Sequence, residues 1–141
     1  MKTTHVIPLI ISIFFSQIYF SQSLLIKGFF KNNQEETIQA SYMLIANNEV
    51  VCSGDEKKIK IELELNNDYI LIVSKKGYVT KSVTFSTHTS DKEQFCFEFD
   101  MYLKEEPEKC NTISIVSTNV FYDSKSRAFN YTISKKQYSQ H

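Results

Sequence analysis

The chain has 141 residues, of which 42% are apolar and 13% aromatic, and its 16 basic residues balance its 16 acidic ones. This length suits one small globular domain, and the aromatic content excludes an intrinsically disordered class. The charge balance excludes the strongly basic composition of many nucleic-acid-binding proteins, and three glycines and two prolines exclude a collagen-like chain. We therefore expect one packed domain that does not bind nucleic acid.

Residues 1–23 have the pattern of a cleaved secretory signal peptide. A weakly basic start precedes the apolar run 6–20, which is shorter than the roughly 20 residues that a spanning helix needs. The small residues Ser21 and Ser23 suit cleavage after Ser23, and cleavage after Ser21 is the close alternative. An uncleaved membrane anchor is the competing interpretation, which the short run disfavours. The sequence thus predicts a secreted or periplasmic, cell-envelope protein with no membrane span after cleavage.

The first part of the domain alternates between strand-like runs and turn signals. Gly28, inside the first run, is typical of a bulge or a close backbone approach. Asn47-Asn48 predicts a two-residue hairpin turn, and the mixed pattern of 38–46 predicts a strand covered on both faces. Residues 54–58 are expected to form a charged turn. Strands are predicted over 24–30, 38–46, 49–53 and 59–65.

Two later strands alternate strictly between apolar and polar residues. In 59–65 the aliphatic residues share one face, and in 94–103 three phenylalanines do so. Full burial of each phenylalanine would contribute roughly 2–3 kcal/mol, which predicts a core position. We expect these two strands to face each other across two layers.

Between them lies the stretch 68–85, which predicts a β-hairpin. The apolar run 69–73 is too short for a helix, and Gly77 supplies the positive φ that the turn requires before a second strand over 79–86. With the other runs, this makes seven short strands and no amphipathic helix. The sequence therefore predicts an all-β, seven-strand antiparallel β-sandwich of transthyretin-like or immunoglobulin-like type.

The order of these features resembles the carboxypeptidase regulatory-like (transthyretin-like) domain of secreted and envelope proteins of bacteria. Gly28 in the first strand, Ala40 opening the second and Tyr69 before the stretch Ser74–Lys81 with its Lys-Gly-Tyr sequence carry the likeness, which covers 24–103. The chain departs from the family in the turn before Ile59, where Ser-Gly-Asp-Glu stands. The resemblance implies a non-catalytic module that braces, spaces or contacts a partner, and related sandwiches bind carbohydrate.

The tail, 104–141, lies outside the resemblance. An acidic, proline-containing break opens it, followed by short β-like runs at 112–116, 120–122 and 128–133. These runs predict either a C-terminal hairpin or a mobile tail, since isolated hairpins are marginally stable in water.

The sequence contains no recognisable catalytic, cofactor or metal-binding constellation. No G-x-S-x-G elbow is present, and the histidines and cysteines lack the spacing of a metal site. Cys52 and Cys96 form the candidate disulfide, Cys110 being left over, and three unpaired thiols are the alternative. The sequence therefore predicts a protein that is not an enzyme and that has no cofactor.

Tyrosines outside the core pattern give the remaining indication of function. Tyr78 and Tyr102 are candidate ligand-contact aromatics for a sugar platform, although tyrosines at sheet edges more commonly satisfy backbone groups, and Tyr69 has the position of a structural corner tyrosine. We expect a non-catalytic accessory or interaction module whose partner is an envelope or extracellular protein. A carbohydrate-binding module is the alternative.

Overall fold

The computed structural model describes residues 22–106 and 112–139. Every regular element in these residues is a strand, and side-chain positions are described except in 112–116 and 135–139. The strands are β1 (Ser23–Lys31), β2 (Ala40–Ala46), β3 (Glu49–Glu56), β4 (Lys58–Glu64), β5 (Asp68–Ser74), β6 (Lys81–Ser86), β7 (Phe95–Tyr102), β8 (Thr112–Asp123) and β9 (Ala128–Ser139).

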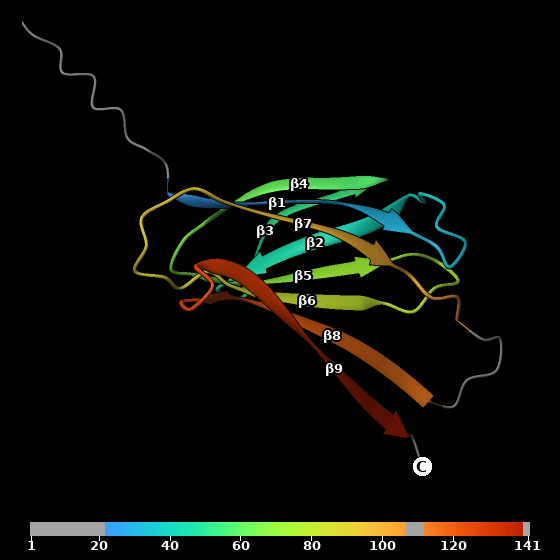
Figure 1. The fold of residues 1–141 in the computed structure, drawn as a ribbon. Coiled ribbons are helices and arrows are strands. Elements are labelled where there is room, and N and C mark those ends of the chain that lie inside the picture. The colour runs from blue at the N-terminus through green and yellow to red at the C-terminus, as the bar shows by residue number, and fades with distance from the viewer. Residues whose placement is uncertain (1–21, 107–111, 140–141) are drawn as a thin grey trace, which may run out of the picture.

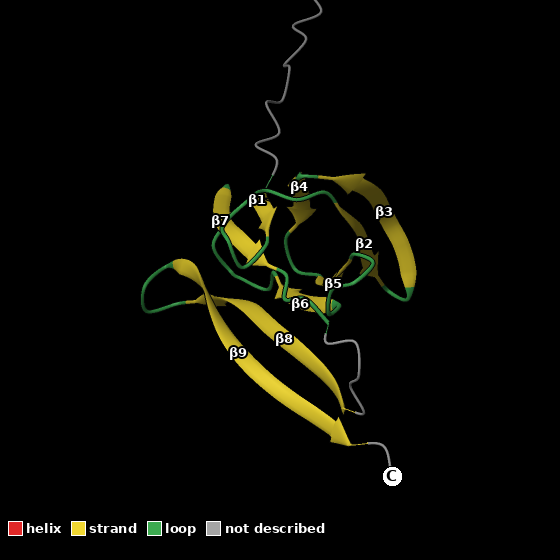
Figure 2. Ribbon diagram, turned by 90° about the vertical axis from the view of Figure 1, so that its right-hand side faces the viewer, coloured by secondary structure: helices red, strands yellow, loops and turns green. Residues whose placement is uncertain are grey.

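The strands form two facing sheets, as Figures 1 and 2 show. A six-stranded sheet has the order β3-β2-β5-β6-β8-β9, and a three-stranded sheet has the order β4-β1-β7. The prediction of an all-β fold is confirmed. The predicted count of seven strands is wrong because the tail contributes β8 and β9. The purely antiparallel arrangement is also wrong, since β1 pairs with β7, and β6 with β8, in parallel.

The predicted opposition of the two strictly alternating strands is wrong. Strands β4 and β7 lie in the same sheet, one on each side of β1. Alternation identifies the inner face of a strand but not its sheet, because any strand with one buried face has period two. The predicted charged turn at 54–58 is also shorter than expected, since β3 continues to Glu56 and β4 begins at Lys58.

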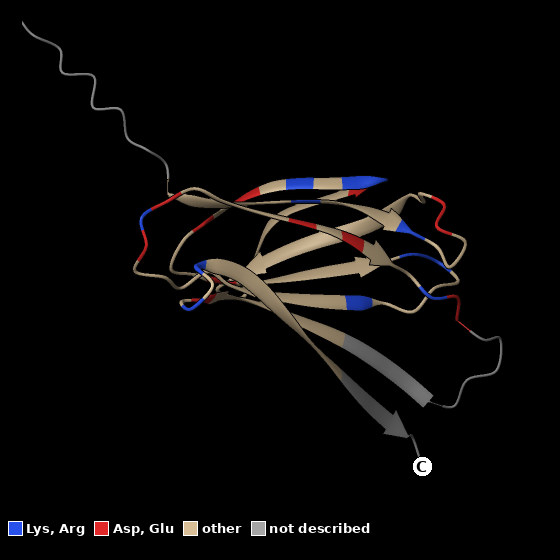
Figure 3. Cartoon of the chain, in the orientation of Figure 1, with Lys and Arg blue, Asp and Glu red and all other residues tan. Residues whose placement is uncertain are grey.

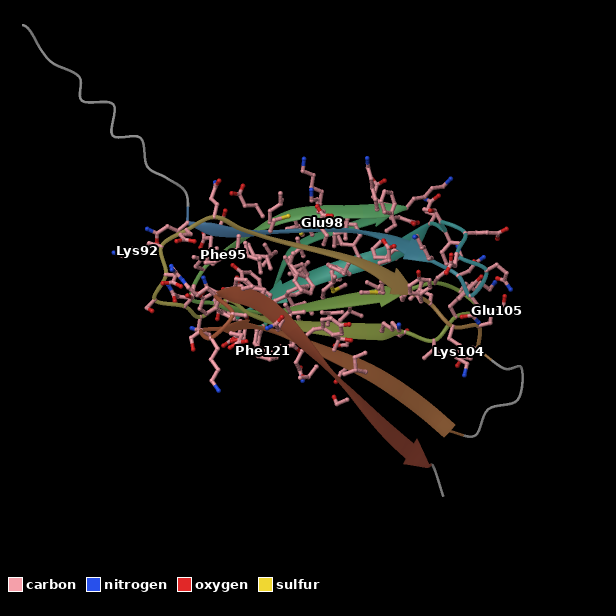
Figure 4. All side chains as sticks on the ribbon, in the orientation of Figure 1. Lys92, Phe95, Glu98, Lys104, Glu105 and Phe121 are labelled. Atoms are coloured by element: carbon pink, nitrogen blue, oxygen red, sulfur yellow. The ribbon has the colours of Figure 1, made fainter. Side chains whose placement is uncertain are left out.

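One apolar core lies between the layers. All described side chains are drawn in Figure 4, where those of the two sheets fill the space between them. The phenylalanines of β7 pack against this core without complete burial, because β7 is an edge strand of its sheet. The largest fully buried apolar side chains come from both layers and the segments between strands: Leu24, Ile26, Phe30, Leu44, Ile59, Leu63, Leu71, Val73, Phe85, Leu103 and Val120.

Glycine and asparagine hold the positions where side chains or ordinary backbone angles do not fit. A Cβ atom on Gly28 would overlap the backbone carbonyl oxygen of Phe99 on β7, which confirms the predicted close approach. Gly77 has φ of 84°, as the predicted hairpin turn requires. Asn47 and Asn48 have φ of 52° and 61°, which suits the two-residue hairpin turn between β2 and β3.

A polar corner joins the two sheets where β4 leads into β5. The Tyr69 hydroxyl accepts a hydrogen bond from the backbone N–H of Glu64 at 3.1 Å and donates to its carbonyl oxygen at 3.4 Å. The buried Thr87 hydroxyl lies 2.8 Å from the Glu64 carbonyl and 2.9 Å from that of Asn67. Burial raises the pKa of Tyr69, so its hydroxyl stays protonated as a donor. These contacts agree with the structural role expected for Tyr69.

Of the two predicted alternatives for the tail, a hairpin and a mobile tail, the structure has the hairpin. Its turn packs against the start of β7 and the loop before it. Phe95, Tyr122 and Phe129 pack edge to face, with ring centroids 5.3 to 5.5 Å apart. Arg127 approaches Asp91 at 3.6 Å and Glu93 at 3.4 Å. The pKa of the Tyr122 hydroxyl is raised mainly because it donates a hydrogen bond to Asp91, and burial is the second cause. The turn of the hairpin is therefore held by both aromatic and polar contacts.

Candidate interaction surfaces

The outer face of the three-stranded sheet is charged and internally paired. Lys27 approaches Glu98 at 2.6 Å, and Lys31 approaches Asp100 at 2.7 Å, so lysines of β1 pair with carboxylates of β7. The hydrogen bond to Lys31 is the main reason that the pKa of Asp100 lies below its ordinary value. Strand β4 adds four more outward charges, namely Lys58, Lys60, Glu62 and Glu64. Figure 3 shows the charged residues on this sheet and on the loops.

The outer face of the six-stranded sheet is different. Its described outward positions carry charges only at or next to strand ends, at Asp55, Asp68 and Asp123. In the register of β3, β2 and β5, Ile45 lies opposite Val50 on one side and Ile70 on the other. We call the outward side chains Met43, Ile45, Val50, Ile70 and Ile72 the apolar outer patch.

The apolar outer patch is exposed to solvent. Met43 is 41% exposed and Ile70 is 42% exposed. The prediction that β2 is covered on both faces is therefore wrong for the described chain. Exposed apolar side chains that adjoin one another, without charges between them, are typical of surfaces that contact another molecule.

A groove lies between β7 and the C-terminal hairpin. Its volume is about 460 Å³, and its apolar walls come from Phe97, Phe99 and Met101 on β7 and from Val83, Val120, Tyr131 and Ile133 on the six-stranded sheet. Both flanking strands are sheet edges within residues 22–106 and 112–139, where β7 pairs only with β1 and β9 only with β8. Tyr131 and Ile133 are each 60% exposed although they are on the inner face of β9. We call this feature the edge groove.

One lysine lies in the edge groove on the inner face of the sheet. Lys81 occupies the same face as Val83 and Phe85 and is half-buried. Within the described part of the chain, no ion pair or hydrogen bond engages its ammonium group. Burial lowers the pKa of Lys81 because the charged form loses hydration.

Sequence reasoning placed Lys81 in the apolar register of its strand but assigned it no role. A lysine at the same period as two buried apolar residues was the available signal. Tyr131 and Ile133 were missed as groove residues because their exposure depends on where the hairpin leaves the sandwich, which alternation does not report.

The two candidate ligand-contact tyrosines lie in different surroundings. Tyr78 is half-buried and packs against the core, and it forms an isolated bridge with Glu105. Tyr102 is exposed on the outer side of β7 and borders the edge groove. No ring contact joins them in the residues that the structure describes. Their role in sugar binding stays a prediction.

The expected Cys52–Cys96 disulfide is not formed in the structure, where both thiols are free. Cys52 points inward from β3, and Cys96 is exposed on the outer side of β7, in the other sheet. Burial raises the pKa of the Cys52 thiol, which makes its thiolate scarcer. Cys110 lies outside the described residues.

Within the ranges 22–106 and 112–139, no group of three histidine, cysteine or carboxylate side chains is arranged to hold a metal ion. The same ranges contain no helix that is long and apolar enough to cross a membrane. Comparison with known proteins adds no assignment: no family model matches the chain, and no curated protein does.

Proposed function

We propose that this chain is an exported, non-catalytic β-sandwich module that binds a protein partner in the cell envelope or the extracellular space. The apolar outer patch carries the proposal. Strands β2 and β5 contain nearly continuous apolar runs, a pattern typical of strands covered on both faces. The opposite sheet covers the inner face, and no described segment of the chain covers the outer face of β2 and β5. A partner protein would supply the missing cover.

The proposal includes the finer fold assignment, a carboxypeptidase regulatory-like (transthyretin-like) sandwich. The two-sheet arrangement supports it, as do the close approach of Gly28 to Phe99 on the neighbouring strand β7 and the hairpin turn through Gly77. The fold alone does not name an activity, so the functional part of the proposal rests on the surface.

Export is also part of the proposal. Ser23 is the first residue of β1, is buried, and donates a hydrogen bond to Glu62 at 2.5 Å. This contact favours cleavage after Ser21 over cleavage after Ser23, because the later cut would remove a residue of the first strand. Mass spectrometry of the mature N-terminus tests the choice, and a chain that retains residue 1 would contradict export by a cleaved signal.

A capture experiment tests the function. The purified chain, immobilised through its C-terminus, is incubated with an envelope extract of its own source, and retained proteins are identified by mass spectrometry. We expect one protein to be retained by the unchanged chain and lost with Ile70→Lys, which puts a charge within the patch. Retention that is unaffected by this change would contradict the proposal.

A glycan array with the same purified chain tests the carbohydrate-binding alternative. Saturable sugar binding that is lost on Tyr102→Ala would favour the alternative, and an array without binding would favour a protein partner.

A further inference from the structure

We infer that the edge groove binds an extended peptide segment of a partner protein, with alternating apolar side chains and one acidic side chain that pairs with Lys81. This inference rests on the proposed function, since it assigns a binding mode to an interaction module. It concerns a different surface from the apolar outer patch.

The unpaired edge of β7 in the edge groove favours an extended peptide as the ligand. Strand β7 has no neighbour on its groove side in the described chain, so its backbone N–H and C=O groups on that side are available to another strand. Addition of an extended segment to such an edge is a common mode of peptide recognition, in which backbone hydrogen bonds give affinity and alternate side chains give specificity. Strand β9, the other edge, lies across the groove.

The side chains of the groove fit the alternation of a strand. Phe97, Phe99 and Met101 follow one another at period two on the inner face of β7. Tyr131 and Ile133 repeat the same spacing on β9, opposite Val120 and Thr118. An extended peptide with apolar residues at every second position would bury them between these two rows.

Charge selects the acidic residue. The ammonium group of Lys81 is half-buried in the groove without a carboxylate partner among the described residues. Glu98 and Asp100 also line the groove, but their carboxylates pair with Lys27 and Lys31 on the outer face. The lowered pKa of Lys81 agrees with an ammonium group that lacks a counter-charge. A carboxylate at this point would restore the lost stabilisation of the charge.

Sheet register places the acidic residue at one end of the peptide. The aromatic contacts of Phe95 close the groove near the hairpin turn. Lys81 lies two residues before Val83 and four before Phe85 on the same face of β6, toward the opposite end. The acidic side chain is therefore expected at the Lys81 end of the peptide. It lies beyond the apolar positions that contact Phe97 and Tyr131, not between those positions.

Binding of defined peptides to the purified full chain tests the inference. The probe is a fluorescein-labelled, end-blocked peptide of about seven residues, the usual length of a strand, that alternates valine and threonine and carries one glutamate in the valine register near one end. Matched peptides carry glutamine or lysine at that position. Fluorescence anisotropy measures affinity, and amide hydrogen exchange locates the bound peptide.

We expect the glutamate peptide to bind about tenfold more tightly than the glutamine peptide, the usual effect of a hydrogen bond to a charged group. It should slow exchange of amides along β7. Lys81→Met should remove the preference while keeping the apolar stem, and Lys81→Glu should reverse it toward the lysine peptide.

Two exposed aromatic residues of the hairpin provide a matched pair of further variants. Tyr131→Ser should weaken all three peptides without affecting folding, because the ring is 60% exposed on the groove side. Phe121→Ser, on the outer side of β8, should leave binding unchanged.

Several results would overturn the inference: no binding by any of the three peptides, an unchanged glutamate preference in Lys81→Met, or exchange protection away from β7. If Lys81→Met instead caused the chain to associate with itself, Lys81 would be a guard that protects a free edge from pairing. Failure of the peptide test leaves the capture test of the apolar outer patch intact, because the two experiments probe opposite sides of the six-stranded sheet.

Discussion

The outer faces of the two sheets differ in the kinds of side chain that they expose to solvent. The three-stranded sheet carries paired charges, such as Lys27 with Glu98, that remain hydrated. At its described outward positions, the six-stranded sheet carries mostly apolar, serine, threonine and asparagine side chains, with charges at or next to strand ends. Because both sheets cover the same core, this difference does not come from folding requirements. It agrees with the proposal that the larger sheet faces another protein.

The difference is also visible in the sequence of the strands. In β4 every second residue is charged, whereas in β5 Ile70 and Ile72 interrupt the expected alternation. An alternating strand satisfies one core, and a continuous apolar run satisfies an inner core and an outer contact. Variants that damage one sheet and leave the other in place test this difference between the sheets.

The largest effect is expected at Gly28, on which the smaller sheet depends. Gly28→Ala places a Cβ atom against the carbonyl oxygen of Phe99 and must push β7 away from β1. We expect a loss of about 3 kcal/mol in the free energy of unfolding, at the upper end for an overpacked site. Urea unfolding measures it.

Gly77→Ala is the matched control for this change. Its Cβ atom would meet no neighbouring atom, but φ of 84° costs a non-glycine residue about 1–2 kcal/mol. A Gly28→Ala variant no less stable than Gly77→Ala would show that β7 does not lie against Gly28 as described.

An effect of similar size is expected at Phe129, which anchors the extension of the larger sheet beyond the smaller one. Phe129→Ala removes the ring that packs on Phe95 and Tyr122, and we expect a loss of about 3 kcal/mol together with faster amide exchange in β8 and β9. Ile133→Ala, at an exposed position of the same strand, should change stability by about 0.5 kcal/mol or less. Unchanged exchange in Phe129→Ala would contradict the docking of the hairpin.

A smaller effect is expected in the reactivity of the cysteines. Cys52 occupies an inward position and Cys96 an outward one. Single-thiol variants, with the other two cysteines replaced by serine, are alkylated at neutral pH. Cys96 should react on the order of tenfold faster than Cys52, because Cys96 is exposed and burial raises the pKa of Cys52. If neither Cys52 nor Cys96 of the unreduced natural chain can be alkylated, the result would support the predicted Cys52–Cys96 disulfide.

Much of the fold follows from local patterns in the sequence. Seven strands, the turn at Gly77 and the contact at Gly28 were predicted because each depends on residues close in sequence or on a property that only glycine has. The assignment of strands to sheets was not predictable, because β1 joins β4 to β7 through pairings that no local signal specifies.

The candidate surfaces were harder to predict for the same reason. The apolar run of β5 was recognised as a strand, but its outer face becomes a patch only when β2 and β3 lie beside it in register. The edge groove requires β7 and β9, which are far apart in sequence and lie in different sheets. Lys81 gave the one local signal, a charge in an apolar register.

The affinity of the captured partner for two matched variants tests the central claim most directly. Ile70→Lys and Phe29→Lys make the same kind of change at similar exposure, 42% and 46%, on the outer faces of the larger and the smaller sheet. The account predicts that Ile70→Lys weakens binding by about tenfold or more, whereas Phe29→Lys leaves it within about twofold. Equal effects, or a larger loss with Phe29→Lys, would contradict the assignment of the six-stranded sheet as the partner-facing surface.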